Sequence, residues 1–138
     1  MDWNDYFLGI AEAVSKRSPD PNTKHGCVIV DSQNRILSTG YNGPVQGIDT
    51  SLVDFTRPGK YMWLLHAEDN AVTFSKCDLT NARVYVTGHP CIGCFRRLAQ
   101  AGISEVYYGD RYSKCVTDGE MFIIRQIAKS KGMKLLEI

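Results

Sequence analysis

Apolar residues near the start of the chain recur at the spacing of one helix face. They are Trp3, Phe7, Ile10, Ala11 and Val14. Asp2 stands directly before this run and is a favourable helix N-cap residue. Turn-forming residues crowd positions 18–22, so the pattern predicts a first helix that ends before Ser18.

Five short segments rich in β-branched, aromatic and other apolar residues predict strands. They span residues 27–30, 35–40, 82–87, 103–108 and 134–137. Turn formers at 32–34 join the first two strands as a hairpin. Residues 45–63 show no clean period, and we expect a loop or insertion there.

Three further helices alternate with the later strands, at 66–75, 91–101 and 117–131. A capping box opens the last of them at Thr117, and Gly132 is placed to end it. A hairpin followed by β-α-β units predicts an α/β fold, with a five-stranded mixed sheet and helices on its faces. Right-handed crossovers would make the last three strands parallel. We assign residues 1–138 to one domain, since this length suits a single one.

Charge and composition narrow the classes of function. The chain carries 16 basic and 15 acidic residues, a formal net charge of +1, which argues against a nucleic-acid partner. No apolar run approaches the roughly 20 residues that span a bilayer, and the N-terminus lacks the basic start of a signal peptide. Five cysteines, an odd number, do not suggest a disulfide framework. We therefore expect a soluble, cytoplasmic protein with no membrane or nucleic-acid partner.

Two clusters carry the candidate chemistry, each at the start of a predicted helix. His66 and Glu68 stand in the first cluster, and Cys91 and Cys94 stand in the second. Two thiolates and an imidazole are good zinc ligands, and three protein ligands leave a fourth tetrahedral position for water. Such a zinc ion could ionise water near neutral pH. Glu68 is close enough to His66 in the sequence to carry the proton without being a ligand.

Each cluster alone has other interpretations. Cys-x-x-Cys is also a redox motif or half of a structural zinc site, and His-x-Glu is common by chance. In a thiol oxidoreductase, His66 and Glu68 would be a coincidence, whereas a non-catalytic zinc module would have no need of Glu68. The joint occurrence of both clusters, in this order, favours catalytic zinc.

His-x-Glu followed by Pro-Cys-x-x-Cys resembles the signature of the cytidine and deoxycytidylate deaminases. Here it is formed by His66, Glu68 and residues 90–94, and the resemblance covers most of the chain. It implies a cytidine-deaminase-like three-layer fold and zinc held by His66, Cys91 and Cys94. It also implies Glu68 as the catalytic acid and base.

Within this family the chain is most similar to the deoxycytidylate (dCMP) deaminases. Residues 17–27 are similar to their N-terminal motif, and residues 40–44 resemble their Gly-Tyr-Asn-Gly motif. This resemblance implies hydrolytic deamination of dCMP to dUMP and ammonia, which supplies dUMP for thymidylate synthesis.

The same resemblance implies nucleotide contacts. Substrate contacts are expected from Lys24, Asn42, Ala67 and Tyr112, and effector contacts from Gly40, Tyr41, Asn42 and Gly43. Deaminases of this type are commonly homohexamers that dCTP, with Mg²⁺, activates and dTTP inhibits. Glycines in this loop would let backbone amides approach a phosphate.

Several of these positions have a structural alternative. Asn42 precedes a glycine and forms a common turn pair. Ala67 is a good helix former, and Tyr112 could be a core or rim residue. Lys24, like Arg17 and Arg111, is by default a solvated charge.

Three positions depart from the family pattern. His25 and Cys27 stand where small or apolar residues are expected, and His89 replaces a more usual apolar residue. We expect His25 to be structural. The cysteines outside the zinc cluster, Cys27, Cys77 and Cys115, are expected to be buried thiols.

Two other deaminases share the metal signature. A tRNA adenosine deaminase would need a basic face, which a net charge of +1 does not offer. A free cytidine deaminase is disfavoured by the helix at 117–131, because this helix makes the last strands parallel, as in the deoxycytidylate branch.

Overall fold

Five strands form one mixed sheet in the computed structural model, which describes residues 1–112 and 115–138. They are β1 (Gly26–Val30), β2 (Ile36–Tyr41), β5 (Arg83–Val86), β6 (Glu105–Tyr108) and β7 (Lys134–Glu137), in the spatial order β2-β1-β5-β6-β7. β1 pairs antiparallel with β2 and β5. β5, β6 and β7 are parallel, as predicted.

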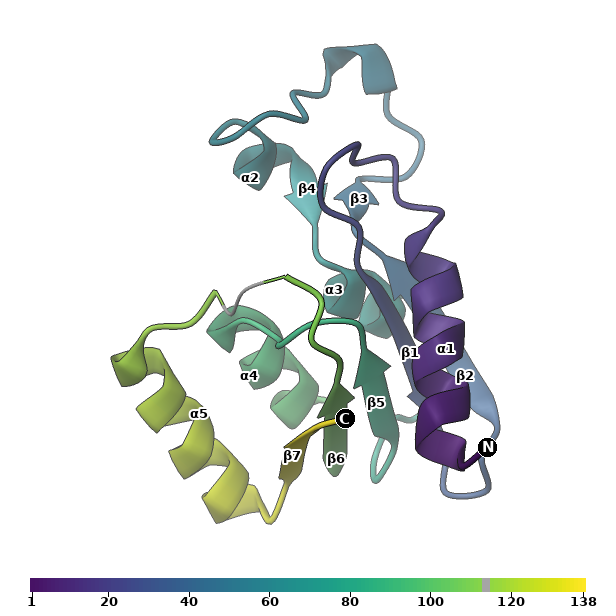
Figure 1. Cartoon of the computed structure of the whole chain (residues 1–138), viewed down its shortest axis with the longest axis vertical. Coiled ribbons are helices and arrows are strands. Elements are labelled where there is room, and N and C mark those ends of the chain that lie inside the picture. Colours follow the sequence, from purple (N-terminus) through teal and green to yellow (C-terminus); the bar gives the residue numbers. More distant parts are fainter. Residues whose placement is uncertain (113–114) are drawn as a thin grey trace.

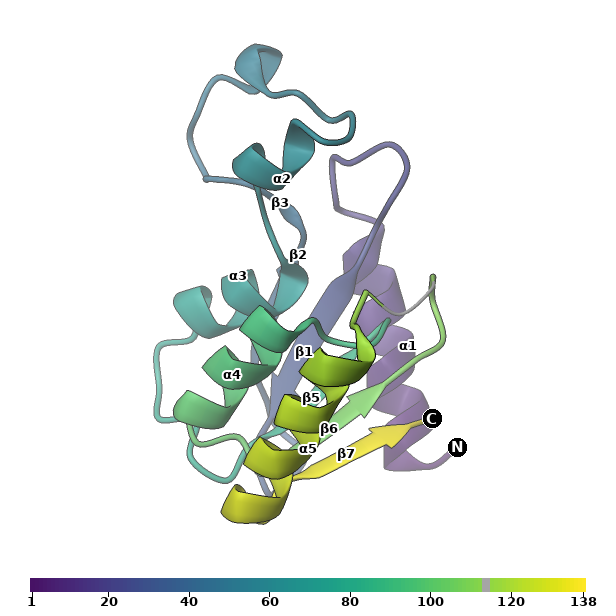
Figure 2. The same ribbon diagram turned by 90° about the vertical axis from the view of Figure 1, so that its left-hand side faces the viewer.

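Helices cover both faces of this sheet and make three layers (Figures 1 and 2). Helix α1 (Trp3–Ser15) packs on one face. Helices α3 (Ala67–Phe74), α4 (Ile92–Gln100) and α5 (Asp118–Lys131) lie on the other. Among the described residues, no helix is long and apolar enough to cross a membrane.

Strand β1 separates the two halves of the core because successive side chains of a strand point to opposite faces. Val28 and Val30 pack with the α1 residues Phe7 and Ala11. Cys27 and Ile29 belong to the larger core cluster under the other helices. All five β1 residues are buried, which explains why this strand appears in the sequence as a continuous apolar run.

The predicted helix caps are confirmed. The Asp2 carboxylate accepts a hydrogen bond from the backbone N–H of Asp5 at 2.7 Å. Thr117 and Glu120 form the reciprocal bonds of a capping box at the start of α5. Gly132 ends that helix at a left-handed φ of 66°, a conformation that glycine adopts without steric cost.

Residues 45–63, where we expect a loop or insertion, form an insertion with short elements of its own. The segment contains a 3-10 helix at Thr50–Leu52 and a short helix, α2 (Lys60–Trp63). On either side of it, β3 (Gly43–Pro44) pairs with β4 (Leu64–Leu65) as a second, two-stranded sheet. Elements of two to four residues are shorter than the window that reveals a hydrophobic period. Figure 1 shows this segment projecting beyond the end of the main sheet.

Gly40 permits a close contact between β2 and α3. A Cβ atom at this position would lie 2.4 Å from the backbone nitrogen of Ala71 and 2.5 Å from the carbonyl oxygen of Ala67. Any larger residue would push α3 away from the sheet. This contact matters for the site because α3 carries His66 at its N-terminal end.

Candidate active site

Two helix N-termini bring the three predicted zinc ligands together. His66 is the N-cap residue of α3, and Cys91 is the N-cap residue of α4. Cys94 lies one turn further into α4 and faces the same direction as Cys91, as expected for a spacing of three residues. An ion pair between Asp69 on α3 and Arg97 on α4 links the two helices beside the cluster.

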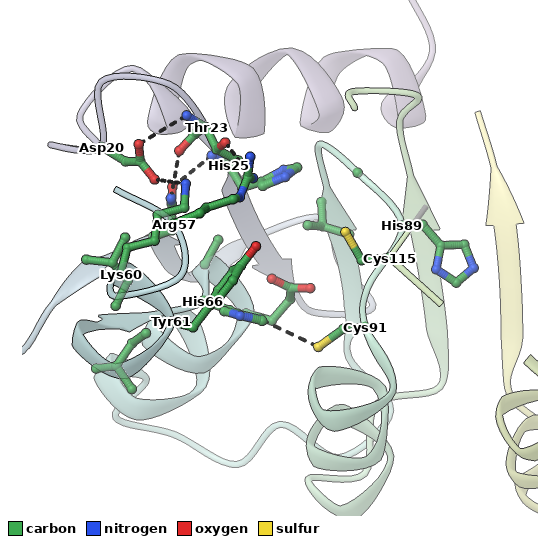
Figure 3. Close-up of a pocket in the computed structure, with 17 residues that line it drawn as sticks. Asp20, Thr23, His25, Arg57, Lys60, Tyr61, His66, His89, Cys91 and Cys115 are labelled. Carbon is green, nitrogen blue, oxygen red and sulfur yellow. Dashed lines mark hydrogen bonds and ion pairs between the residues drawn. The ribbon is translucent and has the colours of Figure 1, made fainter. Parts of the chain in front are cut away.

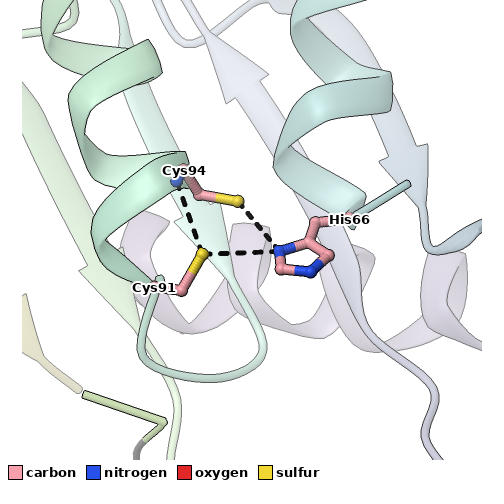
Figure 4. A group of neighbouring side chains, drawn as sticks. All are labelled: His66, Cys91 and Cys94. Carbon is pink, nitrogen blue, oxygen red and sulfur yellow. Dashed lines mark hydrogen bonds between the residues drawn. The ribbon is translucent and has the colours of Figure 1, made fainter. Parts of the chain in front are cut away.

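The geometry of this cluster fits a zinc ion. Nδ1 of His66 lies 3.1 Å from Sγ of Cys94 and 3.5 Å from Sγ of Cys91 (Figure 4). All three donor atoms lie within 4.8 Å of one another. Typical Zn–N and Zn–S bond lengths place tetrahedral nitrogen and sulfur donors about 3.6 Å apart. The three donors are therefore spaced to share one metal ion.

The two thiols of the cluster differ in acidity. Hydrogen bonds from the thiol and backbone N–H of Cys94 outweigh burial and, together with neighbouring His66, lower the pKa of Cys91 to about 3. The bond to the Cys91 thiolate and burial raise the pKa of the Cys94 thiol. A divalent cation between the sulfurs would displace the shared proton, since metal ligands bind as thiolates.

Glu68 lies in the first turn of α3 and is 6% exposed. Burial raises the pKa of its carboxyl, although hydrogen bonds from its own backbone N–H and from Cys94, and the charge of His66, oppose the shift. A carboxylate with a raised pKa both accepts and returns a proton more readily near neutral pH. Glu68 therefore has the environment of a proton carrier.

A cavity of about 150 Å³ joins Glu68 to the metal cluster (Figure 3). Its wall includes His66 and Cys91. The other described lining residues come from the loop before β1, from Asn42, from the 57–65 segment, from Ala67 in α3, from the end of β5 and the turn after it, and from Cys115. The two motifs found in the sequence thus line one cavity.

Only two of the four predicted substrate residues are among the described lining residues of the cavity. Asn42 and Ala67 line the cavity. Asn42 accepts a hydrogen bond from the backbone N–H of His25 and donates one to the carbonyl of Thr23, each at 2.8 Å. Lys24 and Tyr112 are not among the described lining residues, and the Nζ of Lys24 donates to the carbonyl of Ser18 at 2.5 Å.

Three of the predicted effector residues, Gly40, Tyr41 and Gly43, line a separate open groove of about 740 Å³. Arg17 lies in the same groove, as does Asn70 of α3. Asn42, between Tyr41 and Gly43, lines the catalytic cavity instead. The stretch from the end of β2 to the start of β3 therefore contributes to the walls of both spaces.

Sequence reasoning missed the end of the cavity that lies away from the metal cluster. Asp20, Thr23, Arg57 and Lys60 line it, and the last two come from the segment that has no period. One chemical argument could have pointed to them: a nucleotide phosphate needs a cationic partner. Arg57 and Lys60 are the cations of that segment.

The remaining histidine and cysteine predictions have mixed outcomes. Cys27 is buried as expected, but Cys77 and Cys115 are exposed because they lie in connections outside the sheet. His25 lines the cavity, and its Nδ1 lies 2.8 Å from Oγ1 of Thr87. Burial and the charge of Arg111 lower the pKa of His25 to about 4, so its imidazole is neutral at pH 7.

Comparisons with known proteins agree on one family. The family profile of the cytidine and deoxycytidylate deaminase zinc-binding region matches residues 1–110. A probable deoxycytidylate deaminase of Caenorhabditis elegans is 42% identical over 144 aligned positions, covering 96% of this chain and 73% of that protein. The deoxycytidylate deaminase of Homo sapiens is 35% identical over 120 positions, covering 81% of this chain and 67% of that protein.

A solved structure agrees with these sequences. The dCMP deaminase from the cyanophage S-TIM5, crystallised with dCMP and dUMP, superimposes with a TM-score of 0.80 and 28% identity. The match covers 97% of this chain and 95% of the phage chain. The three-layer arrangement predicted from the sequence is therefore the fold of a known nucleotide deaminase.

Proposed function

The chain belongs to the cytidine and deoxycytidylate deaminase family, and on this premise we propose that it hydrolyses dCMP to dUMP and ammonia. One observation carries the proposal: a zinc-compatible cluster of His66, Cys91 and Cys94 lies beside buried Glu68 at one cavity. When bound, zinc supplies a Lewis acid that activates water near neutral pH. The dUMP formed would supply thymidylate synthesis.

Glu68 moves the protons of this reaction. It accepts one proton from the attacking water and passes it to the pyrimidine ring, then accepts the second from the new C4 hydroxyl and passes it to the leaving amine. A carbon–oxygen bond forms at C4 of the base, the carbon–nitrogen bond breaks, and ammonia leaves. Burial among the cavity residues keeps bulk water away from this exchange and raises the pKa of Glu68, as its double role requires.

Asn42 and Ala67 orient the nucleotide. Both of them line the cavity. Asn42 is held by two hydrogen bonds, and these use only one N–H of its amide. The second N–H is available to the sugar of the substrate. Ala67 has a small side chain at the start of α3, so its backbone amide can approach the pyrimidine carbonyl.

Tyr112 and Lys24 remain predicted substrate residues, and we place them at the edge of the site. The Tyr112 hydroxyl accepts from the backbone N–H of Lys24 at 3.1 Å and donates to the carbonyl of Asn22 at 3.3 Å. These bonds fix the tyrosine beside the loop that lines the cavity. The ring of Tyr112 also contacts the ring of His25, which is a cavity residue.

Ammonia release across a panel of dCMP, CMP, deoxycytidine and AMP tests the substrate. We expect dCMP to give the highest kcat/KM, with dUMP as the product. Equal or better activity on deoxycytidine would favour a free-nucleoside deaminase, and activity on AMP alone would favour an adenosine deaminase.

Regulation by dCTP with Mg²⁺ and by dTTP, in a homohexamer, is the finer part of the proposal. The β2–β3 junction at 40–43 supports it, because Tyr41 and Gly43 line the groove and Asn42 lines the cavity. Asn70 of α3 donates to the carbonyl of Tyr41 at 2.8 Å, which ties this junction to the helix of Glu68. A ligand in the groove could thus shift the substrate site, as a coupling free energy requires.

We expect a sigmoid velocity curve for dCMP that dCTP makes hyperbolic and dTTP shifts to higher dCMP. The measurement is initial velocity against dCMP concentration, with and without each triphosphate. A hyperbolic curve that neither triphosphate changes would reject regulation and leave the deaminase assignment in place.

A further inference from the structure

Among the described residues, two acidic and two basic side chains line the catalytic cavity, and three of these charges already have a role. Glu68 serves the reaction at the metal end. Asp20 and Lys60 form an ion pair at 2.9 Å, with side chains 1% and 6% exposed. Burial opposes ionisation of Asp20, but the bonds from Lys60 and from two backbone N–H groups outweigh it and lower the pKa of Asp20. Arg57 is the fourth charge.

The Asp20–Lys60 ion pair fixes one side of the cavity at the end that lies away from the metal cluster. Its two opposite charges cancel, so the pair adds no net charge there. Asp20 belongs to the loop before β1, and Lys60 begins α2. The same carboxylate accepts hydrogen bonds from the backbone N–H groups of Asn22 and Thr23. The ion pair therefore holds the segment that carries Arg57 against the loop that carries Thr23.

Arg57 keeps its positive charge available. Within the described part of the chain, the ion pairs are Lys60–Asp20 and Arg97–Asp69, so Arg57 has no carboxylate partner there. Its side chain donates one hydrogen bond to Oγ1 of Thr23 at 3.2 Å. A guanidinium has five N–H donors, and its planar fork matches the oxygens of a phosphate.

The position of Arg57 in the cavity suits the far end of a nucleotide. Figure 3 shows Arg57 and Thr23 at one end of the cavity, and His66 and Cys91 at the other. A substrate with its base beside Glu68 must extend its 5′-phosphate away from the metal cluster. Thr23 accepts from Arg57 and still has its own hydroxyl proton to donate.

We propose that Arg57 and Thr23 together bind the 5′-phosphate of the substrate and so select nucleotides over nucleosides. This inference rests on the proposed dCMP deaminase activity. It assigns the phosphate to Arg57 of the 45–63 segment and to Thr23, rather than to Lys24. Lys24 is unsuited because its Nζ is turned to the carbonyl of Ser18, outside the cavity lining.

The test compares kcat/KM for dCMP and for deoxycytidine in four proteins: wild type, Arg57→Ala, Arg57→Lys and Lys24→Ala. Arg57→Ala should lower kcat/KM for dCMP by about 10- to 100-fold, the scale of lost hydrogen bonds to a charged group. It should leave kcat/KM for deoxycytidine unchanged. Arg57→Lys should recover part of the loss, and Lys24→Ala should lose less than Arg57→Ala in kcat/KM for dCMP. Arg57 is exposed, so its replacement should not disturb folding.

An equal loss on both substrates in Arg57→Ala would overturn the inference, and so would a dCMP-selective loss in Lys24→Ala alone. Calorimetric binding of dUMP and deoxyuridine separates this inference from the proposed function. Binding of dUMP that depends on Arg57, in a protein that does not deaminate dCMP, would uphold the phosphate site and reject the activity. Turnover of dCMP that is indifferent to Arg57 would reject the phosphate site and uphold the activity.

Discussion

Replacing Glu68 with glutamine should lower kcat for dCMP by at least about 10²-fold, the scale of general acid–base catalysis. Glutamine has nearly the same shape but cannot accept the proton of the attacking water. Glu68 is buried in the first turn of α3 and is not one of the three clustered donors, so the variant should keep its fold and its metal. Steady-state kinetics with zinc analysis of the same sample makes the measurement.

Glu12→Gln is the matched control, because Glu12 is an exposed glutamate on α1. It should leave kcat unchanged. A Glu68→Gln variant with near-normal kcat would show that another group carries the proton. Loss of zinc together with activity would instead indicate that Glu68 supports the metal site.

Removing one thiolate should strongly weaken zinc binding and lower turnover with it. In Cys91→Ala the cluster retains only His66 and Cys94. Outer residues that merely orient a ligand already contribute about 10- to 100-fold in metal affinity, so we expect zinc affinity to fall by more than about 100-fold. Competition with a chromophoric chelator measures the affinity, and turnover of dCMP is followed in parallel.

Cys77→Ala provides the comparison, since Cys77 is an exposed cysteine outside the cluster. It should retain wild-type zinc affinity and turnover. Full zinc affinity in Cys91→Ala would refute the ligand assignment. Full turnover without zinc would favour chemistry that does not use the metal.

The main strands and helices could be predicted because each has its own local signal. Strand β1 is a continuous apolar run, and α5 has both a capping box and a terminal glycine. Cys91 is the N-cap residue of α4, and the spacing to Cys94 places both sulfurs on one face. These signals depend on neighbours in the sequence, so no tertiary information was needed.

The end of the cavity formed by Asp20, Thr23, Arg57 and Lys60 could not be predicted, because long-range pairing determines it. β3 and β4 have two residues each and are joined across a segment of nearly twenty others. The Asp20–Lys60 ion pair links residues forty positions apart. No periodicity reveals such contacts, so Arg57 and Lys60 were not predicted.

The assignment of residues 1–138 to a single domain stays a prediction.

Reconstitution of the metal-stripped chain tests the central claim most directly. Zinc is added stepwise to the protein, and the rate of dUMP formation from dCMP is recorded at each step. The cluster of His66, Cys91 and Cys94 predicts a rate that rises in proportion to zinc and levels off at about one zinc per chain. A full rate before any zinc is added, or no dUMP at any zinc content, would contradict the account.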